Sequence, residues 1–365
     1  MIVWDSFYLW DNSGTTFTDL EFSASDIPGA AVDLMGQTTD KIYMGLDRKF
    51  YAVFFELDTV GDYGTILDWE YWDGSAWKNL AISKNYVLNA VSGVIQYRAP
   101  TDWATTTLAT AESTASGLKS DDSSSGTAKY WLRVAASTIT TVATMHRSFP
   151  FPTYGYTTPS RIAEFLQLRQ DFSTTTSPNI SEVERLIERV ESRIDRYSTN
   201  SWKPNFRQDE MYEFSRYAIV LKRSPVIKLL EMAIWDGSSY NPMSEGRSQD
   251  YFVDDKTGIV PLTRLLSIPF SYSRGASATW GFGEFKRAVR MNYVWGRDFD
   301  EDVASGQVED ITTKLVSADL LSNYDYTTMV PQGTDRFSLD QKIAGWRETA
   351  DERLEELRSV RLWVP

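Results

Sequence analysis

The sequence contains residues of the types that carry out catalysis, but they do not show the spacing of a known catalytic motif. The chain of 365 residues has no cysteine and one histidine, His146, which excludes disulfides, thiolate metal sites and multi-histidine metal sites. Any serine–histidine triad would depend on that imidazole alone. The acidic run Asp298–Asp302 lacks the ligand spacing of a calcium loop, and Gly281-Phe282-Gly283 lacks the third glycine of a dinucleotide fingerprint. The sequence therefore predicts neither an enzyme nor a cofactor.

The segment 181–198 separates apolar, acidic and basic side chains into three sectors of a helical wheel that turns about 100° per residue. The apolar sector holds Val183, Leu186, Ile187, Val190, Ile194 and Tyr197. The acidic stripe is Glu184, Glu188, Glu191 and Asp195, and the arginine stripe is Arg185, Arg189, Arg193 and Arg196. We expect a helix here.

The two charged stripes predict an interface between copies of the chain. Like charges four residues apart on a helix cost a few tenths of a kcal/mol per pair. This cost is relieved when the acidic stripe of one copy faces the arginine stripe of the next, and such head-to-tail contacts close into rings. The alternative is a solvated helix face on which the charges are segregated by chance.

The composition limits the classes of partner. A formal net charge of −13 argues against a protein that wraps duplex DNA, although DNA could slide past an acidic surface. The first residues do not resemble a signal peptide, because Asp5 follows almost at once, and no apolar run approaches the ~20 residues of a membrane span. We therefore expect a protein that is made in the cytoplasm, or packed into something assembled there, with no membrane partner.

The character of the sequence changes near residues 149–160, a segment rich in proline and aromatic residues that we interpret as a linker. Before it, strands are predicted at 50–58, 66–72, 94–98 and 129–135, with a hairpin at Asp73-Gly74. Short turns between strands favour an antiparallel β-sandwich over residues 1–148, of jelly-roll type. The Ser/Thr/Gly-rich stretch 105–128 predicts a mobile loop.

After the linker the chain is mainly helical, with a β-hairpin insertion. Thr158-Pro159 provides an N-cap and an N1 proline, and the capping box at Ser338–Gln341 opens a helix whose apolar residues follow at steps of three and four. Between the helices, strands are predicted at 226–235, 251–253, 258–260 and 276–280. The expected class for residues 161–365 is an α+β domain.

From Pro159 onward the sequence resembles the head–tail connector proteins of tailed viruses. The resemblance is carried, in chain order, by Ile180–Trp202, Leu221–Ile227 with Trp235-Asp236-Gly237, Asp250–Val260, and Ala278–Val289, the last resembling a final strand that leads into a core helix. It implies a structural virion protein that forms a ring, usually of twelve copies, between the portal protein and the tail or a second neck protein. DNA would pass through the lumen without specific binding. The apolar end Arg361-Leu362-Trp363-Val364 would then dock on the portal.

Residues 1–148 resemble the β-sandwich modules of phage virion proteins, through segments such as Trp69–Trp77 and Tyr130–Val134. This resemblance implies a decoration or a fibre anchor, with fibre or decoration proteins as further partners. An alternative is a carbohydrate-binding adhesin that stacks sugars on its aromatic residues, which are Trp69, Tyr71, Trp72, Trp77 and Trp103. Core and cross-strand packing is the competing role for these five side chains. A cell-wall hydrolase is a third alternative.

Overall fold

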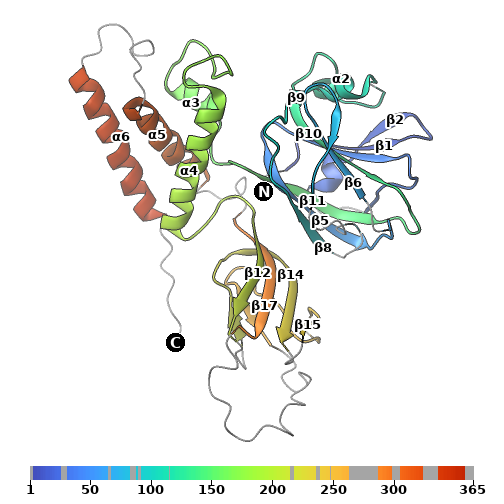
Figure 1. The fold of residues 1–365 in the computed structure, drawn as a ribbon. Coiled ribbons are helices and arrows are strands. Elements are labelled where there is room, and N and C mark those ends of the chain that lie inside the picture. The colour runs from blue at the N-terminus through green and yellow to red at the C-terminus, as the bar shows by residue number, and fades with distance from the viewer. Residues whose placement is uncertain are drawn as a thin grey trace, which may run out of the picture. The chain divides into compact units, whose positions relative to one another are not determined.

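The computed structural model describes residues 3–25, 31–64, 67–82, 88, 92–114, 116–213, 218–235, 239–246, 248–262, 287–297, 305–323 and 336–357. The chain divides into two compact units, unit 1 (Met1–Thr153) and unit 2 (Tyr154–Pro365) (Figure 1). Antiparallel sheets and several helices build them, so the protein is multidomain and of mixed α and β structure, mostly β. The predicted strand at 276–280, the run Asp298–Asp302 and the predicted docking residues Arg361, Leu362, Trp363 and Val364 lie outside the described residues.

Unit 1 contains two antiparallel sheets. The larger sheet has the spatial order β2 (Thr16–Asp19), β1 (Ser6–Asp11), β4 (Lys41–Leu46), β10 (Lys129–Ala136), β6 (Leu67–Trp72), β7 (Trp77–Asn79), with β9 (Thr105–Thr106) also paired to β10. The smaller sheet has the order β3 (Val32–Asp33), β11 (Thr144–Pro152), β5 (Phe50–Thr59), β8 (Ser92–Gln96). A short helix, α1 (Glu21–Ala24), follows β2. The predicted strands correspond to β5, β6, β8 and β10 within two residues, and the hairpin between β6 and β7 is confirmed.

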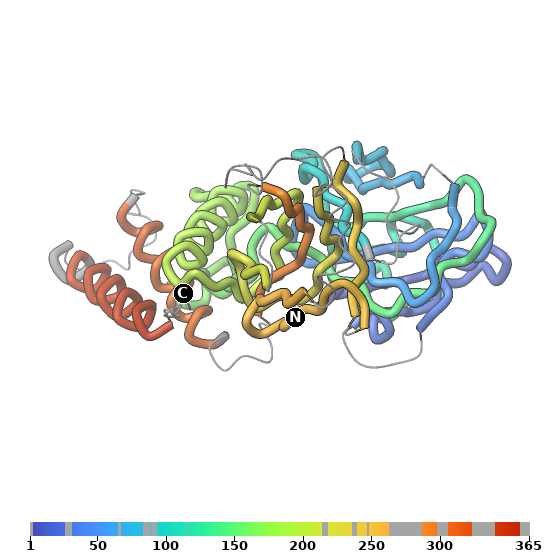
Figure 2. The backbone as a smooth tube through the Cα atoms, turned by 90° about the horizontal axis from the view of Figure 1, so that it is seen from below, coloured from blue at the N-terminus to red at the C-terminus, as the bar shows by residue number. Residues whose placement is uncertain are grey.

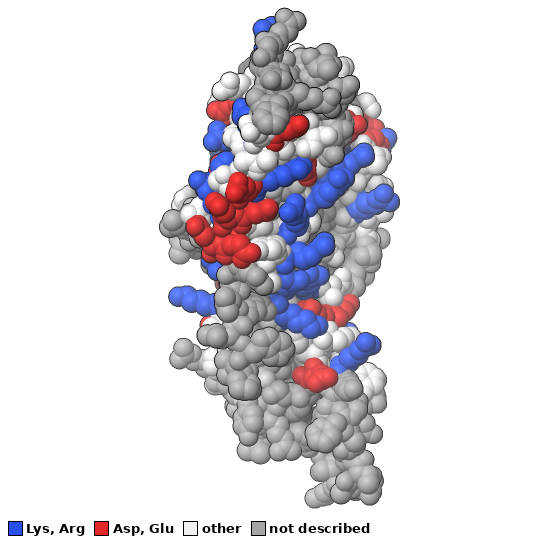
Figure 3. All heavy atoms as spheres, turned by 90° about the vertical axis from the view of Figure 1, so that its left-hand side faces the viewer, with Lys and Arg blue, Asp and Glu red and all other residues white. Residues whose placement is uncertain are grey.

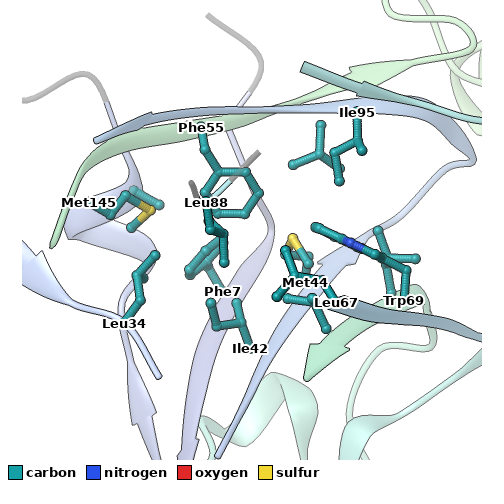
Figure 4. Close-up of a cluster of buried hydrophobic side chains, with 14 of the residues drawn as sticks. Phe7, Leu34, Ile42, Met44, Phe55, Leu67, Trp69, Leu88, Ile95 and Met145 are labelled. Atoms are coloured by element: carbon teal, nitrogen blue, oxygen red, sulfur yellow. The ribbon is translucent and has the colours of Figure 1, made fainter. Parts of the chain in front are cut away.

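One hydrophobic core lies between the two sheets of unit 1. Phe7, Ile42, Met44 and Leu67 reach it from the larger sheet, whereas Phe55, Ile95 and Met145 reach it from the smaller one (Figure 4). Successive residues of a strand point to opposite faces, so Tyr8, Tyr43 and Trp131 lie on the other face of the larger sheet. There they form a second buried cluster with Phe17 and Leu108.

The segment 105–128 covers that second cluster, so the prediction of a mobile loop is wrong for its described residues. It contains β9, α2 (Leu108–Glu112) and the 3₁₀ helix η2 (Ser120–Asp122). Asp122 is fully buried and accepts hydrogen bonds from Ser6 Oγ at 2.7 Å, Tyr8 OH at 2.8 Å and Lys129 Nζ at 2.8 Å. Two anchors, Leu108 and Asp122, therefore hold a stretch whose composition alone suggested mobility.

The predicted linker at 149–160 is also corrected. Residues up to Pro152 belong to β11, where Phe149 pairs with Phe54 and Phe151 with Ala52 of β5. Pro150 and Pro152 lack an N–H donor. Among the described residues, β3 pairs with β11 only at Thr144 and Met145, so no described strand on that side needs a donor from either proline. Tyr154, Tyr156 and Thr157 are then buried within unit 2.

Four helices of unit 2 share one core. They are α3 (Pro159–Phe165), α4 (Ile180–Ser198), α5 (Ser305–Asn323) and α6 (Arg336–Glu356), and α4 lies beside α5 and α6 (Figures 1 and 2). α6 begins two residues before the predicted capping box. No helix in the described part of the chain is both long and apolar enough to cross a bilayer.

The β part of unit 2 has its own core, which includes Met232, Val260 and Tyr293. One sheet has the order β12 (Asn205–Tyr212), β17 (Val289–Trp295), β14 (Val226–Trp235), β15 (Tyr240–Pro242), and a separate pair consists of β13 (Ala218–Val220) and β16 (Ile259–Pro261). β14 spans the predicted residues. The expectation that 285–289 leads into a core helix is wrong, because Val289 opens β17, a strand paired on both sides.

Candidate oligomer interface

Local signals define α4, the helix that carries both charged stripes. The Oδ1 atom of Asn179 accepts the Glu182 N–H at 3.0 Å, and Oε2 of Glu182 accepts the Asn179 N–H at 3.0 Å, which is a complete capping box. The helix ends at Ser198, before Thr199 takes a left-handed conformation with φ of 59°. The apolar sector is buried at Val183, Leu186, Ile187, Val190 and Ile194, as predicted, whereas Tyr197 is exposed.

Glu191 corrects the prediction of an outward-facing acidic stripe, because its side chain is fully buried. Its Oε1 atom accepts the N–H groups of Gly155 at 2.8 Å and Tyr156 at 2.7 Å. Its Oε2 atom accepts from Lys203 Nζ at 2.5 Å, and Lys203 is itself buried. A buried carboxylate needs such partners. Glu191 therefore holds the start of unit 2 against α4 and cannot contact a second copy.

The other three acidic residues of the stripe are partly buried, and at least two of them contact other residues of unit 2. Asp195 accepts a hydrogen bond from the Tyr156 hydroxyl group, which also contacts Ser201 Oγ at 2.9 Å. Glu184 is half-buried and accepts from Tyr154 OH at 3.3 Å, and Glu188 is half-buried as well. The burial of Glu191 could have been anticipated from the sequence. On the helical wheel, Glu191 is the acidic residue nearest to the apolar sector, about 80° from its centre. The partner Lys203 lies beyond the end of the helix and could not be identified from helical spacing.

Burial, with a smaller contribution from the neighbouring charge of Glu191, raises the pKa of Asp195 to about 6 against the opposing effects of Lys203 and the Tyr156 hydroxyl group. Burial, with the charges of Asp195 and Glu191, also raises the pKa of Tyr156 well above its ordinary value. The phenol therefore stays protonated and donates to Asp195.

The Asp195 shift gives a pH-dependent prediction. Between about pH 4 and pH 6 the unfolded carboxyl group loses its proton before the folded one, so its contribution to stability is present below pH 4 and lost as pH rises through 6. Asp195→Asn removes this loss, because the amide oxygen still accepts from Tyr156. We expect the variant to gain up to about 3 kcal/mol over the parent by pH 7, measured as the difference in unfolding free energy across pH 4–7. Glu348→Gln, in an exposed position, is the control, and a difference that does not change with pH would contradict the assignment.

The arginine stripe, in contrast, is exposed along its whole length. Arg193 approaches Asp351 of α6, with 3.7 Å between Nη2 and Oδ1 and both side chains more than half exposed. Within the described residues, Arg185, Arg189 and Arg196 meet neither a carboxylate nor a hydrogen-bond acceptor. Four arginines at helical spacing thus project from a chain of net charge −13, with their mutual repulsion unrelieved on α4 itself.

The five aromatic residues considered for sugar stacking do not form an open platform in the described part of unit 1. Trp69, Tyr71, Trp72 and Trp103 are buried, and Trp77 is half-buried beneath the Arg133 guanidinium, 4.3 Å from its ring centroid. Stacking on a sugar needs an open ring face, so these five side chains have the packing role. His146 is exposed on β11, and the described residues contain no group of three or more acidic or histidine side chains placed to hold a metal ion.

Comparisons with known proteins give structural matches alone. No family model matches the sequence, and no curated protein matches it. Among solved structures, a chain from the neck of an empty GTA particle computed with C6 symmetry matches at 10% identity and a TM-score of 0.30, covering 56% of this chain and 91% of that one. A chain from the virion of a native gene transfer agent (GTA) particle matches at 11% identity and a TM-score of 0.30, with the same coverage.

Proposed function

We propose that this chain is a structural protein of the neck of a virus-like particle, and that it acts by assembly rather than by catalysis. The observation that carries the proposal is the exposed arginine stripe of α4. Four like charges in a row on a helix surface are unfavourable for an isolated protein and favourable for one that meets an acidic surface. The segments after Pro159 resemble head–tail connector proteins in the same order along the chain. This resemblance supports a ring, in which the acidic surface would belong to a neighbouring copy.

In its finer form, the proposal is a ring of about twelve copies between the portal protein and the tail or a second neck protein. The ring is assembled in the host cytoplasm and becomes part of the virion. DNA passes through its lumen without specific binding, which the net charge of −13 favours. Unit 1, with its sandwich core and covered outer face, serves as a decoration or a fibre anchor.

The proposal is tested by locating the chain in purified particles. An epitope tag on the chain, detected by gold-labelled antibody in electron micrographs, should mark the junction between head and tail in every complete particle. Mass spectrometry of the same particles should give more copies of the chain than of a single-copy component. A chain that is absent from purified particles, or that marks the capsid surface uniformly, would refute the proposal.

The last residues of the chain give a separate prediction. Arg361, Leu362, Trp363 and Val364 include three apolar side chains at the end of the chain, and burial of such side chains against a partner is favourable. Deletion of residues 359–365 should abolish sedimentation with purified portal assemblies and leave the far-ultraviolet circular dichroism unchanged. Replacement of Arg361 alone is the control and should weaken the attachment far less. Undiminished attachment of the deletion variant would remove the docking role.

A further inference from the structure

The exposed side of α6 is predominantly acidic. Ile343, Ala350 and Leu354 are buried against the other helices. The helix exposes six acidic side chains and two basic ones, Lys342 and Arg347; at about 100° per residue, Lys342 lies about 40° from Glu356. We name this surface the acidic face; its residues are Asp340, Glu348, Asp351, Glu352, Glu355 and Glu356, all exposed.

Within one chain, the arginine stripe and the acidic face share one edge. Arg193 lies 3.7 Å from Asp351, and the Tyr197 hydroxyl group donates to Glu355. A groove of about 560 Å³ runs between them, lined also by Glu348, Glu352 and Leu354. Figure 3 shows basic side chains in a line beside a group of acidic ones on the side of the molecule that carries these helices. The contact at this edge is therefore already made inside the chain.

The two outer edges remain. On the wheel of α4, Arg185, Arg189 and Arg196 lie about 40–80° from Arg193, on the side away from α6. On α6, Glu348, Glu352 and Glu356 lie about 60–140° from Asp351; Glu348 and Glu352 form the rim of the groove beside α4, and Glu356 lies farthest from Asp351. Each outer edge is a row of like charges about 12–16 Å long, at a rise of about 1.5 Å per residue. The rows are opposite in sign, and the arginine row is longer by slightly less than one helical turn.

We propose that the outer edge of the arginine stripe (Arg185, Arg189, Arg196) binds the outer edge of the acidic face (Glu348, Glu352, Glu356) of a second copy of this chain. The proposal rests on the proposed function and names the surface that the ring uses. It replaces the pairing of α4 with α4, because Glu191 and Asp195 are held inside unit 2. The two edges are different surfaces of one chain, so the contact between two copies is head to tail. In such a pair, one copy still has a free arginine edge and the other a free acidic edge, and each can bind a further copy.

Cysteine cross-linking tests the geometry, because the natural chain has no cysteine. Ser192 is exposed and lies beside the arginines of the outer edge, about 20–60° from them on the wheel. Gly345 is exposed on α6 near the acidic outer edge, and a Cβ atom there meets nothing within 4 Å. With a short bis-maleimide at low ionic strength, the chain carrying both Ser192→Cys and Gly345→Cys should give a ladder of covalent oligomers.

The single variants are the matched controls. Each alone should stay at the size of one chain. Dimers formed by Ser192→Cys alone would show a two-fold contact and overturn the head-to-tail arrangement. A doubly substituted chain that stays at the size of one chain, whether unlinked or linked within itself, would overturn it too.

Charge reversal tests the electrostatics. One variant changes Arg185, Arg189 and Arg196 to Glu, and the other changes Glu348, Glu352 and Glu356 to Lys. Each alone should raise the dissociation constant for self-association at least tenfold, and an equimolar mixture should recover the parent value, because each reversed edge then meets its opposite. Association of the parent should weaken between 50 and 500 mM salt, because screening acts on exposed charges.

A control variant and the particles separate this proposal from the proposed function. Arg169→Glu, Arg207→Glu and Lys256→Glu together change the net charge as much as the arginine reversal does, at exposed positions outside α4 and α6, and should leave association unchanged. Failure of the mixture to recover association, or an equal loss in the control, overturns the interface. If the charge-reversed chains still enter the neck of particles, the proposed interface is wrong and the proposed function stands. If the parent chain associates with itself but is absent from particles, the interface stands and the proposed function is wrong.

Discussion

Replacing Lys203 by methionine is expected to cost unit 2 about 3–5 kcal/mol of unfolding free energy. Lys203 provides the only cation within hydrogen-bond distance of Glu191 among the described residues, at 2.5 Å, and both side chains are buried. Methionine fills a similar volume but leaves the carboxylate with the two N–H groups of Gly155 and Tyr156 alone. A buried charge without its counter-ion carries most of its desolvation cost.

Hydrogen exchange read by mass spectrometry measures this loss in the whole chain. Peptides from α4 should exchange far faster in the Lys203→Met variant, while peptides from β5 and β10 in unit 1 should keep their protection. The double variant Glu191→Gln with Lys203→Met removes both charges and should recover a large part of the loss. Lys256→Met, at an exposed position, is the control. A loss below about 1 kcal/mol in the single variant would mean that the pair is not the buried bridge described here.

The second large effect is expected in unit 1, at Asp122. Asp122→Ala removes the acceptor of three buried donors, Ser6 Oγ, Tyr8 OH and Lys129 Nζ. Lys129 would be left as a buried cation, so we expect a cost of about 3–5 kcal/mol. Because Asp122 is one of the two anchors of the segment 105–128, its loss should also loosen the cover over the outer face of the larger sheet, which includes Trp131.

Limited proteolysis and denaturant unfolding measure the two consequences together. The variant should be cut within residues 105–128 at protease concentrations that leave the parent intact, and its unfolding midpoint should fall. Asp121→Ala is the matched control, since it removes the same charge from the neighbouring, exposed position. Equal cleavage of the Asp121 and Asp122 variants would contradict the anchoring role.

Local signals in the sequence located several elements correctly. The spacing of Val183, Ile187, Val190 and Ile194 located α4 without reference to the rest of the fold, and the structure adds the capping box at Asn179 and Glu182. β14 and the β6–β7 hairpin were located in the same way, from apolar runs and Asp-Gly. Such signals depend on residues a few positions apart, which is why one sequence is enough to detect them.

Other features depend on contacts that the sequence does not display. α5 escaped prediction because it is buried on several sides, with Thr312, Ser317 and Ala318 as deeply buried as Val308 and Ile311, so no polar face marks its period. The role of Glu191 depends on Lys203 and on the backbone of residues 155–156, which only the tertiary fold brings to it. The acidic face of α6 became a candidate for the arginine stripe only after the structure removed Glu191 and Asp195 from the surface.

The most direct test of the central claim is a cryo-electron microscopy reconstruction of the head–tail junction in purified particles. The account predicts a closed ring of this chain at that position, with the outer arginines of α4 in each copy facing the acidic face of α6 in the next. A junction built without this chain would contradict the claim.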